Sequence, residues 1–177
     1  MNHSFLQGNR VILRAMEPED LSFLYMIENN PELWSIGSFT VPYSRFVLKE
    51  YIRQSQYDLF ADKQLRLMIV RKEDDLVIGT IDITDFVPIH NRGAVGIALL
   101  REFRKNGYAA ESLKLLCRYA FEFLHLKQLY AHIPADNTDS IRLFSAAGFT
   151  HSGVLKHWLR SNGEYRDALI VQRVIEK

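Results

Sequence analysis

The chain carries the sequence Arg104-Lys105-Asn106-Gly107-Tyr108-Ala109 between an apolar run, residues 93–100, and a run with helical periodicity that begins near residue 107. A strand that leads through a glycine-containing turn into a helix exposes the first N–H groups of that helix, which have no acceptor within it. Such a turn can bind phosphate, and the two basic residues add positive charge. The same pattern is equally typical of an exposed basic turn, so its context must decide between the two interpretations.

The segments before this turn predict an antiparallel sheet. Residues 65–71 and 76–84 are rich in β-formers, and the polar stretch 72–75 between them indicates a hairpin. Residues 93–100 are apolar on both faces, which favours a buried central strand with Gly96 as a bulge or a site of close approach.

The start of the chain predicts a strand followed by two helices. Residues 10–14 alternate between polar and apolar, and residues 17–20 supply a helix start. Residues 29–31, Asn-Asn-Pro, indicate the end of that helix. Residues 34–42 then read as a loop, before a second helix capped by Ser44. Trp34, Phe39 and Tyr43, in and just after this loop, could wall a substrate channel, and packing explains them equally.

The segments after the turn complete an α+β pattern. Apolar residues recur at helical spacing from 107 to 124, a strand follows at 128–133, and a short helix at 137–147 ends at Gly148. Residues 150–159 and 165–174 flank Asn162-Gly163, a strong hairpin signal. Because no repeat or linker interrupts the pattern, we expect one α+β domain over residues 1–177.

Composition excludes several classes of protein. The chain has 177 residues, of which 47% are hydrophobic and 24% charged, as expected for a globular domain rather than a disordered or fibrous chain. Its 22 basic and 21 acidic residues give a net charge of +1, which does not favour nucleic acid as a partner. The sequence shows no export signal, no run of the ~18 apolar residues that a membrane span requires, and no zinc-ligand spacing. With a single cysteine, Cys117, these features predict a cytoplasmic protein without a metal or a membrane partner.

The context of residues 104–109 favours the phosphate-binding interpretation. They resemble the coenzyme A pyrophosphate loop of the GNAT family of N-acetyltransferases, Q/R-x-x-G-x-G/A, with Arg104, Gly107 and Ala109 at its fixed positions. The stretch Asn137-Thr-Asp-Ser-Ile-Arg-Leu-Phe-Ser-Ala-Ala-Gly-Phe149 resembles the family's N-x-x-[SA]-x-x-[LF]-[YF]-x-x-x-G-F segment. With residues 10–14 and 165–174, the resemblance covers essentially the whole chain.

The resemblance implies a fold and a reaction. The fold is a mixed, mostly antiparallel sheet of about seven strands with about four helices, in which splayed central strands form a cofactor cleft. The reaction is direct attack of a primary amine on acetyl-CoA in a ternary complex, with no metal and no acyl-enzyme. The residues it places at the cofactor are Ile97, Ala98, Leu99, Arg104, Lys105, Asn106, Gly107, Tyr108, Ala109, Asn137, Ser140 and Phe144.

Within the family, residues 28–30, 79–85, 90–92 and 162–168 resemble the branch of spermidine and ribosomal-protein N-acetyltransferases. Nearby negative charge favours a cationic acceptor, so Glu28, Asp82 and Asp85 are the expected substrate-binding residues. Asp82 and Asn137 are the expected catalytic residues, and the resemblance places Asn137 beside the pantetheine arm. The ordinary alternatives are a turn residue for Asp85 and a solvated helix end for Glu28.

The acceptor expected from this branch is a polyamine or diamine such as spermidine. A protein N-terminus is the first alternative, and a catalytically silent acyl-CoA sensor is the second. Relatives of the polyamine type form large rings, and a homo-oligomer is compatible with this sequence, but a dimer or a monomer is just as compatible with it.

Two positions depart from the branch pattern. Phe144 stands where a tyrosine is usual, and Ala94 stands where a glutamate is common. Phenylalanine cannot protonate the leaving thiolate, which motivates the sensor alternative.

Other side chains are candidates for proton transfer, each with an ordinary structural alternative. Tyr130 and Tyr165 are possible stand-ins for the missing acid, although packing is the commoner role of a strand tyrosine. His90, His132 and His157 are possible bases, although a surface position explains them equally. Cys117 lies on the apolar stripe of the long helix and is expected in the core.

Overall fold

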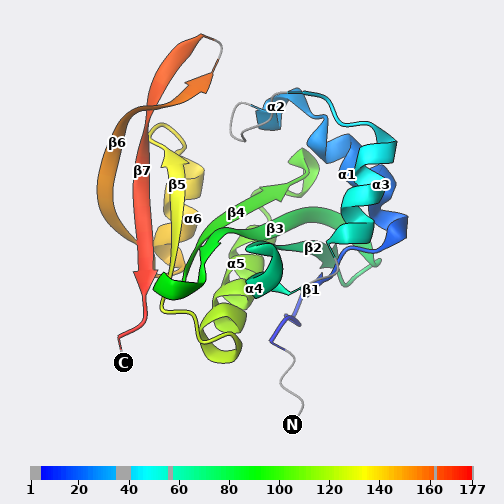
Figure 1. Cartoon of the computed structure of the whole chain (residues 1–177), viewed down its shortest axis with the longest axis horizontal. Helices are drawn as coiled ribbons and strands as arrows, with labels where there is room; N and C mark the ends of the chain where they lie inside the picture. The colour runs from blue at the N-terminus through cyan, green and yellow to red at the C-terminus, as the bar shows by residue number, and fades with distance from the viewer. Residues whose placement is uncertain (1–4, 35–40, 56–57, 162, 177) are drawn as a thin grey trace.

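The computed structural model describes residues 5–34, 41–55, 58–161 and 163–176. These residues form a seven-stranded sheet in the order β1-β2-β3-β4-β5-β7-β6 (Figure 1). Every neighbouring pair is antiparallel except β4 and β5, which are parallel. The strands are β1 (Val11–Arg14), β2 (Leu65–Arg71), β3 (Leu76–Val87), β4 (Arg92–Leu99), β5 (Gln128–Pro134), β6 (Thr150–Ser161) and β7 (Glu164–Val174).

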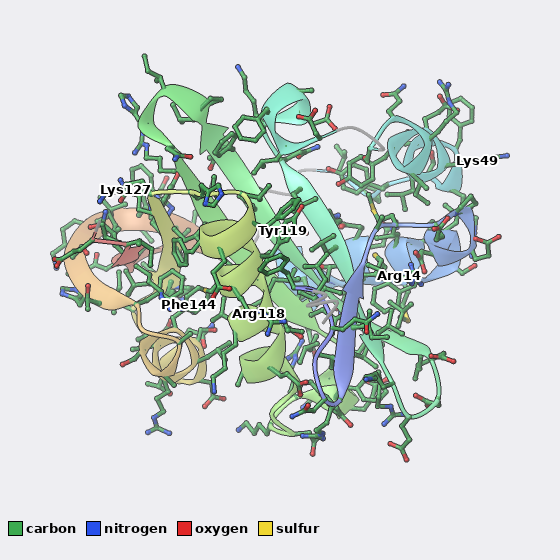
Figure 2. All side chains as sticks on the ribbon, turned by 90° about the horizontal axis from the view of Figure 1, so that it is seen from below. Arg14, Lys49, Arg118, Tyr119, Lys127 and Phe144 are labelled. Atoms are coloured by element: carbon green, nitrogen blue, oxygen red, sulfur yellow. The ribbon has the colours of Figure 1, made fainter. Side chains whose placement is uncertain are left out.

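Six α-helices lie within the described ranges, four of them longer than one turn. The longer helices are α1 (Leu21–Glu28), α3 (Arg45–Gln54), α5 (Tyr108–Arg118) and α6 (Thr138–Ala146), and the short ones are α2 (Pro31–Trp34) and α4 (Leu59–Asp62). Figure 2 places Lys49 of α3 and Phe144 of α6 on opposite sides of the molecule. In the parts of the chain that the structure describes, no helix is long and apolar enough to cross a membrane.

Two hydrophobic clusters occupy opposite faces of the sheet. Side chains alternate between faces along a strand, so Leu67 and Ile69 of β2 point away from Met68 and Val70. Leu67 and Ile69 belong to a large cluster with α5, whereas Met68 and Val70 pack in a smaller one with α1 and α3. The helices α1 and α3 therefore cover one face at the β1–β3 end, and α5 covers the other face at its centre.

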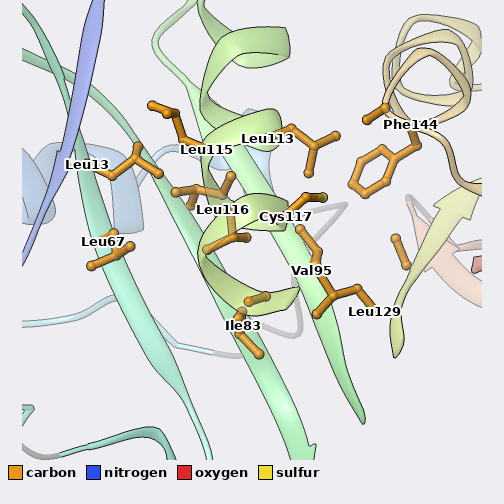
Figure 3. Packing of buried hydrophobic residues seen from close by; sticks show 14 of the residues in the cluster. Leu13, Leu67, Ile83, Val95, Leu113, Leu115, Leu116, Cys117, Leu129 and Phe144 are labelled. Carbon is orange, nitrogen blue, oxygen red and sulfur yellow. The ribbon is translucent and has the colours of Figure 1, made fainter. Parts of the chain in front are cut away.

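The core beneath α5 contains the single cysteine, as predicted. Cys117 is buried beside Leu113 and Leu116, above Val95 of β4 (Figure 3). Burial raises the pKa of the Cys117 thiol to about 11, so the thiolate is scarce near neutral pH. Cys117 is a packing residue, which agrees with a reaction that needs no cysteine nucleophile.

The pairing between β4 and β5 ends early. Their register runs from Arg92 opposite Gln128 to Ala94 opposite Tyr130, although β4 continues to Leu99 and β5 to Pro134. The two central strands therefore separate after Ala94 and Tyr130, as the expected fold requires. On its other side, β4 remains paired with β3 as far as Leu99.

Most elements follow the prediction, and three details were wrong. The helix expected over residues 107–124 ends as an α-helix at Arg118, and a π-helical turn covers Tyr119–Phe123. Gly96 is not a bulge, because it pairs in register with Asp82 while the irregularity lies between Thr84 and Val87.

The third error concerns the residues after α1. The predicted helix stop at residues 29–31 is confirmed, since α1 ends at Glu28, but residue 34 was expected to begin a loop. Pro31 in fact begins α2, which includes Trp34. Phe39, expected in the same loop, lies outside the described residues.

A substitution at Gly79 tests the packing of β3 against β4. A Cβ atom there would lie 2.3 Å from the Ala98 carbonyl oxygen and 3.1 Å from the Leu99 Cα, both backbone atoms that cannot rotate away. We expect Gly79→Ala to destabilise the protein by about 1–3 kcal/mol, measured by urea unfolding. Gly153→Ala in β6 is the matched control, because a Cβ at Gly153 meets no described atom within 4 Å. Equal stability of the two variants would contradict the packing.

Candidate active site

A cavity of about 420 Å³ opens where β4 separates from β5. Its walls come from the end of β4, the turn after it, and the helices α2, α5 and α6. The lining residues are Glu32, Leu33, Ile97, Ala98, Leu99, Arg104, Lys105, Gly107, Ala109, Ala110, Asn137, Asp139, Ser140, Arg142 and Leu143. Nine of the twelve predicted cofactor residues are among them.

The glycine turn presents the start of α5 to this cavity. Gly107 is the N-cap residue and adopts φ 83°, a left-handed conformation that favours glycine. The first helical hydrogen bond is donated by the Glu111 N–H to the Gly107 carbonyl. The N–H groups of residues 107–110 precede that bond, so they have no acceptor within the helix and suit a phosphate.

A residue from the start of the chain fixes the turn. The Arg10 guanidinium donates to the Asn106 carbonyl at 2.7 Å and lies 4.3 Å from the centre of the Tyr108 ring. Asn106 and Tyr108, both predicted at the cofactor, do not line the cavity. They contact Arg10 instead. Arg10 was not predicted to have this role, because nothing in the local sequence links it to a turn almost a hundred residues away.

Basic side chains at the mouth of the cavity have partners within the fold. The Arg104 Nε donates to the Leu99 carbonyl at 3.0 Å, which ties the turn to the end of β4. The Lys105 ammonium lies 3.5 Å from the Asp139 carboxylate of α6, so this pair connects the turn to the opposite wall. Both basic residues line the cavity, as expected of cofactor-binding residues.

The helix α6 forms the other wall. Asn137 is its N-cap, and the side-chain oxygen accepts a hydrogen bond from the Ser140 N–H at 3.1 Å. Asn137 and Ser140 both line the cavity. Phe144 does not: its buried ring points from α6 toward α5 (Figure 3) and contacts Phe149 edge-on at 5.0 Å.

Two of the predicted acidic residues meet on the face of the sheet that carries α1 and α3. Arg66 of β2 forms a bidentate pair with Asp82 of β3, with nitrogen–oxygen distances of 2.9 and 3.0 Å, and also pairs with Glu28. Burial opposes the positive charge of Arg66, but the carboxylates, Asp82 first, outweigh that penalty and raise its pKa. Glu28 is buried rather than the solvated helix end that was the alternative.

We call Glu28, Arg66 and Asp82 the acidic cluster, since two carboxylates surround one guanidinium. Asp82 pairs in register with Gly96 on β4, where a Cβ would meet no described atom within 4 Å. The absence of a side chain at Gly96 therefore leaves open space between Asp82 and the separated strands. Arg66 was missed because a single basic residue on a strand gives no sign of its cross-strand partners.

Asp85 lies apart from the acidic cluster. It is an exposed residue of β3 with φ 48°, at the irregularity between Thr84 and Val87. Burial of Tyr130, with Asp85 nearby, raises the pKa of the phenol. Asp85 therefore lies near enough to Tyr130 of β5 for their charges to interact, and it takes no part in the Arg66 ion pairs.

Other predicted residues are spread over the surface. His90 and His157 are exposed, and Tyr165 is exposed near the end of the β6–β7 hairpin. Tyr43 is held by Asn29, whose side-chain oxygen accepts from the Tyr43 N–H at 2.8 Å. None of these residues lines the cavity.

Glu32 and Leu33 were missing from the predicted lining. They belong to α2, which begins at Pro31, and the Asn30 side chain accepts a hydrogen bond from the Glu32 N–H at 3.0 Å. Proline at the first position of a helix, after an asparagine, is a start signal. The same residues had been interpreted as the end of the preceding helix.

A sheet that opens between two parallel strands, with a glycine turn and a helix N-terminus at its mouth, can bind a phosphate-bearing cofactor. Residues 10–150 match the family model of the acetyltransferase (GNAT) domain. The chain belongs to the GNAT family and is an N-acetyltransferase.

Several relatives are spermidine acetyltransferases. The chain is 29% identical over 162 residues to spermidine N(1)-acetyltransferase of Escherichia coli K12, covering 92% of this chain and 84% of that protein. It is 26% identical to the Vibrio cholerae enzyme of the same name, covering 90% of each. The crystal structure of spermidine N-acetyltransferase from Vibrio cholerae in complex with CoA and spermine superposes with a TM-score of 0.82 at 25% identity, over 94% of this chain and 96% of that one.

A structure from the other predicted branch matches in fold alone. It is a putative ribosomal-protein-serine acetyltransferase from Vibrio cholerae, with a TM-score of 0.73 at 15% identity, over 96% of this chain and 97% of that one.

Removal of Arg66 tests the acidic cluster. In Arg66→Leu the carboxylates of Glu28 and Asp82 lose the same partner, and we expect a loss of about 3–5 kcal/mol. Unpaired carboxylates close together have raised folded-state pKa values, so their charged forms oppose folding as the pH rises. The loss should therefore be larger at pH 8 than at pH 5, measured by urea unfolding at both values.

A control and a second variant keep this test specific. Arg53→Leu removes an exposed arginine that pairs with Glu50 three residues away, and should change stability little at either pH. Adding Glu28→Gln to Arg66→Leu should recover part of the loss at pH 8. If Arg66→Leu loses no more than Arg53→Leu does, Arg66 does not hold the two carboxylates.

Proposed function

We propose that this N-acetyltransferase transfers the acetyl group of acetyl-CoA to a primary amine of a polyamine such as spermidine. The observation that carries the proposal is the acidic cluster, which lies across Gly96 from the separated strands. Its two carboxylates exceed its one guanidinium, so the cluster favours a cationic acceptor. Relatives that are spermidine acetyltransferases support the same substrate class.

The cofactor half of the site consists of the turn, β4 and α6. In this proposal the N–H groups at the start of α5, with Arg104 and Lys105, hold the pyrophosphate. The backbone of residues 97–99 faces the gap left by β5 and would bind the amide groups of the pantetheine arm, with Asn137 on the other side. Acetyl-CoA supplies an activated acyl group as its thioester.

The acceptor half consists of Asp82, Glu28 and Asp85. Asp82, next to the open space at Gly96, would bind the ammonium nearest to the reacting amine, and Glu28 would act through Arg66 as a positioning residue. Asp85 is three residues further along β3, on the order of 10 Å away. Carboxylates at this separation suit an amine with positive charge at both ends.

The proposal also covers the cellular compartment, the domain organisation and the metal requirement of the enzyme. We place the protein in the cytoplasm as a single acetyltransferase domain over residues 1–177, with no metal. The strongest competing proposal is an acyl-CoA sensor, because the buried Phe144 supplies no acid for the leaving thiolate.

The first experiment measures thiol release from acetyl-CoA with spermidine, spermine, putrescine and short peptides with free N-termini. Turnover with the polyamines and none with the peptides is the expected result. Turnover with peptides alone would replace the acceptor by a protein N-terminus. Silence with every amine, together with a thermal shift on adding CoA, would favour the sensor.

Asp82→Asn tests the recognition of the amine. Removing the charge while keeping the shape should raise the KM for spermidine by about 10- to 100-fold, because a hydrogen bond to a charged group contributes about 1.5–3 kcal/mol. The KM for acetyl-CoA should change less than about twofold, since Asp82 does not line the cofactor cavity. Asp74→Asn, in the exposed β2–β3 turn, is the control. Equal increases in both KM values would argue against carboxylate recognition.

A further inference from the structure

The register of the sheet brings Asp82 of β3, Gly96 of β4 and His132 of β5 into line across the gap between the separated strands. Asp82 pairs with Gly96, and Ala94 pairs with Tyr130, which is the last pair before β4 and β5 separate. Two residues further along each strand, Gly96 and His132 stand opposite each other across the gap. Because side chains two residues apart share a face, His132 lies on the same face as Tyr130, Gly96 and Asp82.

His132 is exposed on this face and has aromatic neighbours. Its ring lies 5.5 Å from that of Tyr130 and 6.0 Å from that of Trp158. On β7 its paired residue is the apolar Ile170. The adjacent β5 residues Ala131 and Ile133 point into the core, so the imidazole is directed away from α5.

Each strand near His132 contributes different polar or charged groups. Its own strand contributes the Tyr130 phenol, β3 contributes Asp82, which is paired with Arg66, and β6 contributes the neutral Trp158. Asp85 and Arg92 act on Tyr130, one residue pair nearer the start of β5. No ion pair within the described residues involves the His132 ring.

A bulge in β6 positions Trp158 beside His132. The register of β6 with β7 shifts between Leu155 and Leu159, and His157 in this stretch adopts φ 50°. One Asp167 oxygen accepts from the His157 N–H at 2.9 Å and the other accepts from the Lys156 ammonium at 2.7 Å. Trp158 follows this fixed backbone, so it is a positioning residue for the imidazole.

We propose that His132 is a catalytic residue that removes a proton from the acceptor's ammonium group. A neutral imidazole takes one proton from the ammonium, and the free nitrogen pair forms a bond to the thioester carbonyl carbon. The carbon–sulfur bond breaks, and sulfur leaves with its electron pair. The nitrogen's second proton neutralises the departing sulfur, and His132 returns its proton to water. Histidine is the side chain best suited to accept and return a proton near neutral pH.

The inference rests on the proposed function and adds the residue that generates the nucleophile. It also separates two proton transfers. Phe144 lies where a residue that protonates the departing sulfur is usual. Its buried ring can neither protonate the sulfur nor take a proton from the ammonium. His132 stands on the opposite side of the gap from Gly96 and next to the acceptor, so the base does not depend on an acid at position 144.

The kinetic test uses His132→Gln, which keeps a polar side chain but accepts no proton. At pH 7.5 we expect kcat/KM for spermidine to fall by about 100-fold or more, with no loss of the thermal shift caused by CoA. The fall in wild-type kcat/KM below pH ~6.5 should disappear in the variant. Added imidazole should restore part of the activity of His132→Ala. His90→Gln, an exposed histidine between β3 and β4, should behave as wild type.

A second measurement does not depend on turnover. NMR titration of the His132 imidazole should give a lower pKa when spermidine is added to the CoA-saturated protein, because a nearby ammonium disfavours the imidazolium. Wild-type activity with an unchanged pH profile in His132→Gln, or a pKa of His132 that spermidine does not move, would overturn the role of His132 alone. A wild-type protein that turns over no amine would overturn the proposed function and this inference together.

Discussion

The separation of β4 from β5 after Ala94 and Tyr130 is the constraint on which the site depends. A strand inside a sheet normally pairs along both edges, and buried backbone groups that lose their partners cost free energy. Beyond Ala94, β4 keeps its pairing with β3 and leaves its other edge facing the cavity. The fold therefore provides an open strand edge at its centre, where an extended ligand with amide groups can complete the pairing.

Both faces of the sheet contribute to what surrounds this edge. On the α5 face, Val95 and Leu99 are anchored in the core, so the strand cannot close the gap by shifting toward β5. On the other face, Gly96 has no side chain, and the acidic cluster lies beside it. A single strand thus presents an open backbone edge to the cavity and, at Gly96, leaves open space beside the acidic cluster.

The residues that line the cavity were easier to predict from the sequence than the contacts of the acidic cluster. Gly107 could be recognised because the turn, its positive φ and the helix start lie within a few neighbouring residues. Arg66 could not, since its pairing with Glu28 and Asp82 joins β2, α1 and β3, which are far apart in the chain. Glu32 and Leu33 were missed for a different reason, because Pro31 both follows one helix and begins another.

The same difference explains why the family is easier to identify than the acceptor. A pyrophosphate is held by backbone groups that one short motif supplies, so the motif can be recognised in a distant relative. In the proposed function the amine is recognised by side chains from α1, β2, β3, β5 and β6, which no single short motif brings together. Asp167 illustrates the point: it belongs to the stretch 162–168 that resembles the spermidine branch, yet its contacts in this structure hold the β6 backbone that positions Trp158. Residues that fix the shape of the acceptor side can therefore persist in a sequence while the groups that contact the amine differ.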